Sequence, residues 1–333
     1  MIDRKHLHCL SSNIAKIVMR KFAMPAFITE REDDGLKAVA RLKRTFDLIM
    51  HIRRHKKVVT ALNHPSIRKG LDGKPHLTLK YLHPRYLFRG METDTRVAIV
   101  LHHFDVLQKS LNLSFINTLT GNGLVIWTHE KPQGIHTVAM RYAHPMDNEG
   151  EILLEYRFND TVIYVASFAF APGLIAGLSD RNVLLITRIQ GARQSFEQIS
   201  LAMKSLRGLS GASVLMAALQ GIAGSLNIRT MLGPAAEAQA CYLEHLHSTF
   251  VGMYDDFFAR LNGRRITATL YSIPLPIMEK PLSEVKASNR SKVKMQRDYK
   301  RLIMDGTRNV LHDHCLPQAA WKRDYLTTPN LTL

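Results

Sequence analysis

Cysteine is scarce in this chain, and its three copies lie far apart. Cys9, Cys241 and Cys315 are an odd number at wide spacing, so the sequence holds neither a disulfide framework nor a cysteine-based zinc site. Such usage is typical of a protein from a reducing compartment. The common catalytic signatures are also missing, since no G-x-S-x-G, Walker A, H-E-x-x-H or dinucleotide fingerprint occurs. We assign no metal to the chain.

Long, purely apolar runs are absent too. Residues 161–179 and 208–228 are uncharged, but the first breaks at Pro172-Gly173 and the second is interrupted by glycine and serine. We expect a buried strand and a buried helix there, and no transmembrane segment. Residues 14–22 form a basic amphipathic pattern that either packs on its own domain or lies on a membrane surface.

Acidic residues are outnumbered, and the formal net charge is +17. The excess lies in residues 1–90 and 276–333, whereas residues 91–275 are nearly neutral. With 46% hydrophobic residues, the composition is that of a globular protein rather than a disordered chain. A folded core with basic ends attracts phosphate-rich partners, or the charge serves solubility alone.

Hydrophobic periodicity divides the chain into helical and strand-like segments. Helices are expected at residues 36–57, 96–117, 194–207, 212–226, 237–250 and 283–304, and strands at 151–157, 161–170, 182–190, 228–232 and 266–273. The sequence therefore predicts an α+β fold, mainly helical to about residue 145 and then a mixed central sheet flanked by helices. We divide it into a basic N-terminal segment (1–34), a domain (35–305, with a helical part to 145 and an α/β part from 146) and a C-terminal tail (306–333).

Several segments, in order, resemble the bacterial VirK/YbjX family, which is defined by a domain of unknown function. The matching pieces are Arg96 to Leu107, Glu149 to Phe170, Ile186 to Gly191, Ser200 to Ile228, Tyr254 to Phe258 and Lys286 to Tyr299. The resemblance implies a Gram-negative bacterial protein linked to virulence, envelope homeostasis and resistance to cationic antimicrobial peptides. It implies no settled biochemical activity, and it is compatible with a cytoplasmic protein, peripheral at the inner membrane.

The order of hairpin, strand, glycine turn, helix and strand is similar to the core of the GNAT acyltransferases. In that fold a turn before a helix holds the pyrophosphate of an acyl donor such as acyl-CoA. Gln190-Gly191 and Arg207-Gly208 are the two turns that could serve here. The alternative is that these glycines only permit tight turns and cap helices.

Four residues are candidate acids and bases for acyl transfer. Glu149 and Glu151 flank Gly150 where the hairpin begins, and on a strand they would point the same way, so that proximity raises the pKa of one of them. Tyr254 and Asp255 offer a phenol and a carboxylate just after a helix. Salt bridges for the first pair, and a packed aromatic corner for the second, are the alternatives.

The last expected helix carries a row of cations. Lys286, Arg290, Lys294, Arg297 and Arg301 fall along one i, i+3/i+4 face. We expect this face to bind a phosphorylated ligand or an anionic lipid. The alternative is that its cations pair with acids of the same domain. Nucleic acid is not expected, because no aromatic platform or recognition helix accompanies the charge. Whether the chain is an enzyme stays open at this stage.

Overall fold

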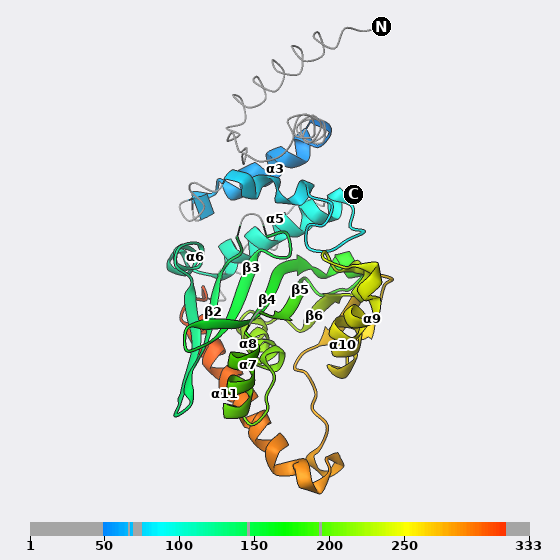
Figure 1. Cartoon of the computed structure of the whole chain (residues 1–333). Coiled ribbons are helices and arrows are strands. Elements are labelled where there is room, and N and C mark those ends of the chain that lie inside the picture. Colours follow the sequence, from blue (N-terminus) through cyan, green and yellow to red (C-terminus); the bar gives the residue numbers. More distant parts are fainter. Residues whose placement is uncertain (1–48, 66, 69–74, 145–146, 193–194, 318–333) are drawn as a thin grey trace, which may run out of the picture.

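The computed structural model describes residues 49–65, 67–68, 75–144, 147–192 and 195–317. The expected N-terminal basic helix, most of the 36–57 helix and the tail beyond 317 lie outside these residues. The fold is α+β, as predicted, and centres on one eight-stranded mixed sheet (Figure 1).

The sheet runs in the order β1-β2-β3-β4-β5-β6-β8-β7. Its strands are β1 (Leu124–Lys131), β2 (Gly134–Tyr142), β3 (Ile152–Phe158), β4 (Thr161–Pro172), β5 (Asn182–Gly191), β6 (Thr230–Pro234), β7 (Arg264–Arg265) and β8 (Leu270–Pro274). Strands β1 to β5 pair antiparallel, β5 and β6 pair parallel, and β8 pairs antiparallel with β6 and β7. The parallel step requires a crossover, which the intervening helices supply.

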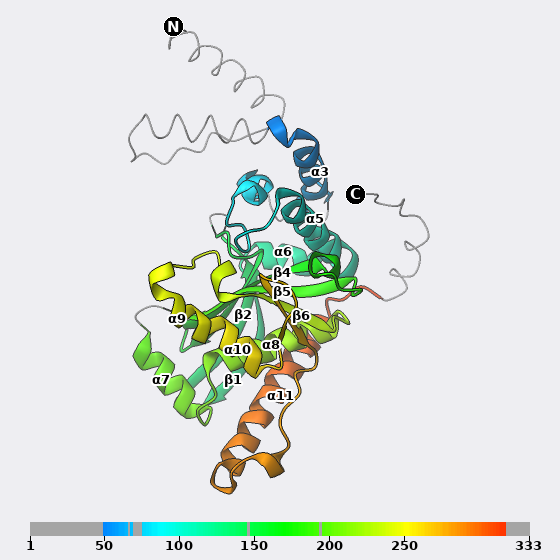
Figure 2. The same ribbon diagram turned by 90° about the vertical axis from the view of Figure 1, so that its right-hand side faces the viewer.

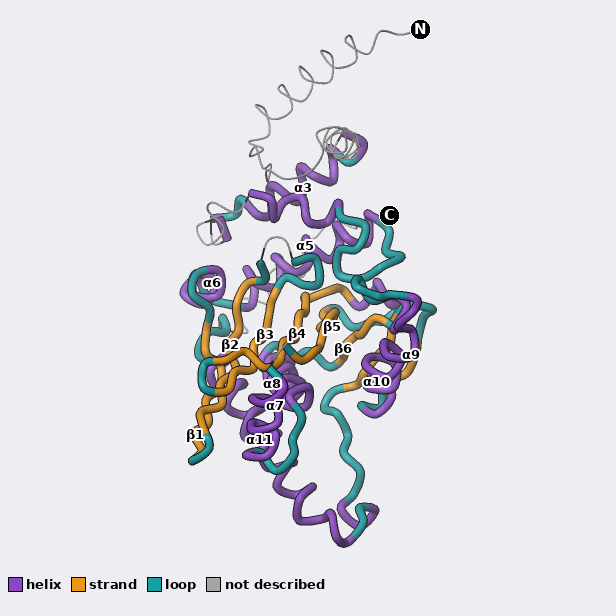
Figure 3. The backbone as a smooth tube through the Cα atoms, in the orientation of Figure 1, coloured by secondary structure: helices purple, strands orange, loops and turns teal. Residues whose placement is uncertain are grey.

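The helices lie on both sides of this sheet (Figure 3). They are α3 (Ile52–Leu62), α5 (Thr93–Ser110), α6 (Leu113–Thr120), α7 (Phe196–Ser205), α8 (Gly211–Ser225), α9 (His247–Phe250), α10 (Asp256–Arg260) and α11 (Arg290–His312). In Figure 1, α3 and α5 lie above the strands, α7, α8 and α11 lie below them, and α9 and α10 flank β6. Helix α5 contacts β4, and α8 contacts β3, β4 and β5.

Most expected elements are present, but two expectations are wrong in part. The helical region ends at Thr120 rather than near residue 145, because β1 and β2 form a hairpin there. The single helix expected at 237–250 is instead a series of short turns, α9 and the π-helix η5 (Val251–Asp255). Its sequence places the polar run Glu244-His245 and His247-Ser248 in exposed positions, so little burial favours one regular helix.

The two uncharged stretches, residues 161–179 and 208–228, contain a strand and a helix that are largely buried. Residues 161–172 are the central strand β4, and Gly211–Ser225 is the mostly buried helix α8. No helix in the described ranges is long and apolar enough to cross a bilayer. Phe104, Phe168 and Phe170 fill the space between α5 and the sheet with almost no exposure, which hides the apolar character of both segments in one core.

Helices α8 and α11 approach closely because α8 carries glycine at the contact. A Cβ at Gly221 would lie 2.5 Å from the carbonyl oxygen of Met304 and 2.8 Å from Cβ of Thr307. Ile303 and Thr307 of α11 are fully buried at this contact. The glycine therefore sets the distance between the two helices, and with it the position of every α11 side chain relative to α8.

We expect Gly221→Ala to destabilise the fold by about 1–3 kcal/mol, because the new methyl group collides with backbone rather than with a movable side chain. The control is Gly252→Ala, where a Cβ has nothing within 4 Å. Urea unfolding of both variants measures the difference. Equal midpoints for the two variants would contradict this account of the α8–α11 contact.

Candidate functional site

A buried carboxylate anchors the start of β3. Glu151 is 2% exposed, and the hydroxyl of Tyr86 donates to its Oε1 at 2.5 Å while Tyr142 donates to its Oε2. Lys80 Nζ lies 3.4 Å from the same Oε1 and donates to the carbonyl oxygen of Gly150 at 2.8 Å. Each oxygen of this carboxylate thus has a donor, which is what a buried charge requires.

The cluster fixes the protonation states of its members. Burial alone would raise the pKa of Glu151, but Lys80, His103 and the two tyrosine hydroxyls outweigh it, and its pKa lies below the usual value. Burial, reinforced by the Glu151 charge, raises the pKa of Tyr86 and Tyr142 well above the usual value. Glu151 therefore stays ionised, so it is not the member of the Glu149/Glu151 pair whose pKa is raised.

His103 of α5 completes this buried cluster. Its Nδ1 accepts a hydrogen bond from the Phe170 backbone N–H at 3.2 Å, and its ring stacks on the Phe170 ring. Its Nε2 is buried without a hydrogen-bond partner in the described part of the chain. Burial lowers the pKa of His103 to about 4, so the ring is neutral at physiological pH.

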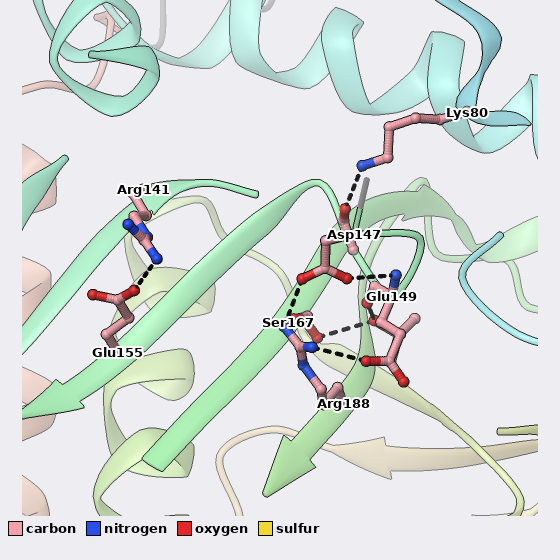
Figure 4. Close-up of polar contacts among 9 residues, drawn as sticks. Lys80, Arg141, Asp147, Glu149, Glu155, Ser167 and Arg188 are labelled. Atoms are coloured by element: carbon pink, nitrogen blue, oxygen red, sulfur yellow. Dashed lines mark hydrogen bonds and ion pairs between the residues drawn. The ribbon is translucent and has the colours of Figure 1, made fainter. Parts of the chain in front are cut away.

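Glu149 belongs to a different cluster from Glu151, although only Gly150 separates them. Arg188 of β5 donates through Nη1 to Glu149 at 2.8 Å and through Nη2 to Asp147 at 2.7 Å (Figure 4). The two glutamates do not share a strand face as expected, because β3 begins only at Ile152 and residues 147–151 form turns. The alternation of side chains along a strand does not apply to them.

Tyr254 reaches the same place from η5. Burial, with the nearby Cys241 and Glu149, raises its pKa far above the usual value, and the backbone of Ile189 in β5 lowers it by less. Partial burial and Glu149 also raise the pKa of Cys241 to about 11, so this thiol is protonated at neutral pH. The structure thus brings together two of the four acid–base candidates, Glu149 and Tyr254.

Asp255 has another role. Its Oδ1 accepts a hydrogen bond from the backbone N–H of Ala236 at 2.9 Å, which fixes the turn after β6 to η5. Because Tyr254 is 1% exposed and packs against Phe250 and Phe258, this Tyr-Asp pair also matches the packed aromatic corner that the sequence left as an alternative.

Strands β5 and β6 part shortly after they meet. They pair only at Leu184 with Met231 and Leu185 with Leu232, although β5 continues to Gly191 with β4 on its other side. From Ile186 onward, β5 has no strand partner on the β6 side among the described residues. An open strand edge within a sheet leaves backbone donors and acceptors available to another group.

The two candidate phosphate turns lie on either side of one aromatic ring. The Tyr164 ring is 3.5 Å from where a Gly191 Cβ would be, and it fills the space that a Cβ on Gly211 would need. Gln190 and Gly191 end β5, and Arg207 and Gly208 precede α8 with positive φ angles of 56° and 81°. The second turn therefore stands directly before the N-terminus of α8, which begins at Gly211.

A cation from α11 joins the second turn. Lys292 Nζ lies 3.1 Å from the Cβ position of Gly208, and Gln296 Nε2 donates to the carbonyl oxygen of Arg207 at 2.9 Å. Ser210 caps α8 by accepting from the Ser213 N–H, so the N–H groups of Gly211 and Ala212 are the ones without an intrahelical partner. Two cations and a helix N-terminus make this turn electropositive.

The cationic face of the last helix is divided by its contacts. Arg290 donates to the carbonyl oxygens of Val285 and Ser283, and Arg297 pairs with Glu279 at 2.9 Å. Arg301 lies 3.6 Å from Asp298 on the surface, whereas Lys286 and Lys294 have no ion pair with any described residue. Lys286 is not on the helix as expected, because α11 begins at Arg290 and Lys286 lies before the short turn that precedes it. Arg290 and Arg297 thus hold the 279–285 segment against α11, and the lysines remain open to a ligand.

One serine resembles a nucleophile but is not activated. The Ser205 hydroxyl lies 2.8 Å from Nε2 of His136, whose Nδ1 is 2.7 Å from the Tyr156 hydroxyl. Ser205 donates its proton to the carbonyl oxygen of Ala202, so the ring must donate to the serine. Burial lowers the pKa of His136 to about 4. This chain fastens α7 to the sheet rather than removing the serine proton.

The family model described as "Protein of unknown function (DUF535)" matches residues 36–301, which is most of the chain. The chain belongs to the DUF535 family. No curated protein and no solved structure matches it at a significant level. This DUF535 protein is therefore interpreted from its own geometry, because the family description assigns no activity.

Sequence reasoning missed much of the site in this DUF535 chain. Lys80, Tyr86, Tyr142 and His103 come from three distant segments and have no shared motif. Arg188 gave a signal that could have been used, since it is a lone cation within the apolar run Val183 to Ile189. A charge inside a buried strand requires a counter-charge, although the sequence does not show which acid supplies it.

We expect Lys80→Met to destabilise the protein by about 3–5 kcal/mol, because it leaves Glu151 ionised and buried without its cation. Lys80→Met combined with Glu151→Gln should cost less than the sum of the single variants. The control is Lys109→Met, whose partner Asp105 is an exposed i, i+4 pair worth under about 1 kcal/mol. Denaturant unfolding compares them, and equal losses for Lys80→Met and Lys109→Met would contradict the buried pair.

Acid should destabilise the fold over the range set by His103. Its pKa is about 4 in the folded chain against the usual 6.5 of histidine, so between these values the unfolded chain binds a proton that the folded chain does not. The free energy of unfolding should therefore fall as the pH is lowered from about 6.5 to about 4, by up to roughly 3 kcal/mol. Glu151, with its lowered pKa, adds a loss at still lower pH.

The variant His103→Gln tests this, because a glutamine oxygen can still accept from the Phe170 N–H. Urea midpoints measured across that pH range should fall less steeply for the variant than for the natural chain. Parallel curves would show that His103 does not control the acid response.

Proposed function

We propose that this DUF535 protein transfers an acyl group from a phosphate-bearing thioester such as acyl-CoA. The observation that carries the proposal is the early parting of β5 and β6 beside an electropositive turn, formed by Arg207, Gly208 and Lys292 before α8. The sheet has β5 and β6 parallel and β8 between β6 and β7, which is compatible with the resemblance to the GNAT acyltransferases drawn from the order of elements in the sequence. This supports binding of the acyl donor where β5 and β6 part, as in that fold.

The free edge of β5 and the turn before α8 each have a role in the proposal. Arg207, Lys292 and the first N–H groups of α8 bind the donor's phosphates. The edge of β5 from Ile186 to Gly191 pairs with the amide groups of an extended donor arm, as one strand pairs with another. Gln190 and Gly191 lie at the end of that edge.

Glu149 is proposed to move the proton, and Tyr254 to stabilise the leaving group. The acceptor's amine or hydroxyl attacks the thioester carbonyl, the carbon–sulfur bond breaks, and the thiolate leaves. Glu149 accepts the acceptor's proton, and Arg188 holds this carboxylate in place. Burial raises the pKa of Tyr254, so it stays protonated and donates a hydrogen bond to the leaving thiolate, and Glu149 returns the acceptor's proton to that thiolate.

A second candidate function rests on the cations of α11. The resemblance to the VirK/YbjX family implies a role in envelope homeostasis, virulence and resistance to antimicrobial peptides. Lys286 and Lys294 have no acidic partner among the described residues, and α11 extends from the body of the protein (Figure 2). Binding of this helix to an anionic lipid surface is compatible with acyl transfer to an envelope lipid precursor, and it could also be the whole function.

Calorimetry with CoA and acyl-CoAs tests the lead proposal. We expect the natural chain to bind, and Arg207→Gln with Lys292→Gln to bind about tenfold more weakly or worse, because two charge-assisted contacts are lost. The control is Arg260→Gln with Arg264→Gln, which removes the same charge from exposed positions on α10 and β7. Tyr254→Phe should keep the affinity and lose turnover.

Failure of the natural chain to bind any of these ligands would refute the transferase. Salt-sensitive binding to anionic vesicles, in the absence of acyl-CoA binding, would support the second function instead.

A further inference from the structure

A cavity of about 470 Å³ lies at the other end of α8. It is open to solvent, and both of its arginines, Arg229 and Arg308, are exposed. It is walled by the last turns of α8, the end of β8 and the middle of α11, which contributes Met304 and Arg308. Its size falls in the range of small-molecule sites. The acyl-transfer site proposed above begins at Gly211, so this cavity is separated from it by the length of the helix, about 20 Å at 1.5 Å per residue.

The walls are held by contacts that do not depend on a ligand. The Leu275 N–H donates to the carbonyl oxygen of Arg229 at 2.8 Å, which closes the junction of β6 and β8. The Ile277 N–H donates to Oε1 of Gln220 at 3.0 Å, and the Ser225 hydroxyl donates to the carbonyl oxygen of Arg308. The cavity is therefore already formed in the free chain, so that little ordering opposes binding.

The ionisable residues of the lining are two arginines. Arg229 and Arg308 line the cavity, no carboxylate does so, and neither arginine has an ion pair with any described residue. The Arg308 guanidinium lies over Gly224, where a Cβ would be 2.8 Å from its Nη2. The Gln220 amide, whose oxygen is engaged by Ile277, presents its NH₂ donors as well. The polar groups of the cavity are thus mainly donors.

The negative end of the α8 dipole would oppose an anion here, but its carbonyls are largely engaged. The oxygen of Ala223 accepts from the N–H groups of Leu226 and Ile228, and that of Gly224 accepts from the Asn227 N–H. Carbonyls that already accept hydrogen bonds present less negative potential to a ligand. Two full positive charges then outweigh the roughly half charge of a helix end.

The remaining wall is apolar. Ile228, Leu275, Pro276 and Met304 provide it, and Ile228 is 4% exposed. We propose that this cavity binds a small amphiphilic oxyanion, with its phosphate or carboxylate group between Arg229 and Arg308 and a short apolar chain against Ile228 and Met304. Planar guanidinium groups suit both oxyanions, because each can donate two parallel hydrogen bonds. The proposal is independent of the acyl-transfer site.

Calorimetry with hexyl phosphate, hexanoate and inorganic phosphate at about 0.15 M salt tests it, since this salt screens general attraction to the basic chain. Hexyl phosphate or hexanoate should bind, and whichever binds more tightly identifies the head group. Inorganic phosphate should bind at least about tenfold more weakly than hexyl phosphate, because it leaves the apolar wall unused.

Two variants and a control separate the cavity from the net charge. Arg229→Gln with Arg308→Gln should weaken hexyl phosphate binding at least about tenfold. Gly224→Leu fills the cavity without changing the charge and should weaken it comparably. Arg260→Gln with Arg264→Gln removes two exposed arginines from α10 and β7 and should leave the affinity unchanged.

The cavity proposal is wrong if the natural chain binds neither amphiphile, if the control loses as much affinity as the cavity variant, or if Gly224→Leu binds as the natural chain does. Equal affinity for inorganic and hexyl phosphate would also overturn it. An unchanged urea midpoint for each variant shows that the fold is retained. Acyl-CoA binding should persist in the variant Arg229→Gln/Arg308→Gln. The cavity proposal and the transferase proposal can therefore fail independently.

Discussion

The buried ion pair between Lys80 and Glu151 constrains the polypeptide on both sides of the candidate site. It ties the 3-10 helix η1 (Pro75–Leu82) to the start of β3, and the same ammonium group donates to the carbonyl oxygen of Gly150. A buried pair of this kind adds little net stability, but removing one partner is costly. Its consequence is geometric, because the short segment before β3 cannot shift without exposing or unpairing a charge.

That segment is held from the opposite direction by Arg188. The arginine binds Asp147 and Glu149, while Thr187 beside it donates to the carbonyl oxygens of Glu149 and Ser167. A Cβ on Gly150 would lie 2.7 Å from Cβ of Ser167, so only glycine allows the segment to lie so near β4. Residues 147–151 are thus clamped between two cations, and Glu149 is presented beside Tyr254 by a backbone that has little freedom. Such preorganisation is what proton transfer requires of a base.

The elements that the sequence predicted well are those whose pattern is local. The β3–β4 hairpin, β5, α7 and α8 all follow from the periodicity of their own residues and their glycine or asparagine turns. The β1–β2 hairpin was missed because His129 and His136 interrupt its apolar alternation, although His136 is in fact buried against Tyr156 and Phe158. The helix expected at 237–250 failed for a different reason, since its spacing fits a helix but residues 241–249 are mostly exposed.

The site was only partly predictable because its chemistry depends on long-range pairing. Glu149 and Tyr254 could be named from the sequence, yet nothing local shows that Arg188 rather than Glu151 is the neighbour of Glu149. The cations of the last helix illustrate the same limit. Their spacing on one helical face was clear, but whether each is open to a ligand depends on acids and carbonyls contributed by residues 279–285.

Helix α8 links these separate features into one arrangement. Gly211 lets its first turn approach Tyr164 of β4, and Gly221 lets its middle approach α11. The first contact sets the helix N-terminus near the end of β5, and the second brings Lys292 to the turn at Gly208 and Arg308 to the far end at Gly224. Gly211 and Gly221 therefore set the position of the helix, and with it where two cations of α11 lie. Because a glycine replaced by any larger residue would separate these surfaces, the electropositive character at both ends of α8 depends on the packing of the helix as much as on the number of basic residues.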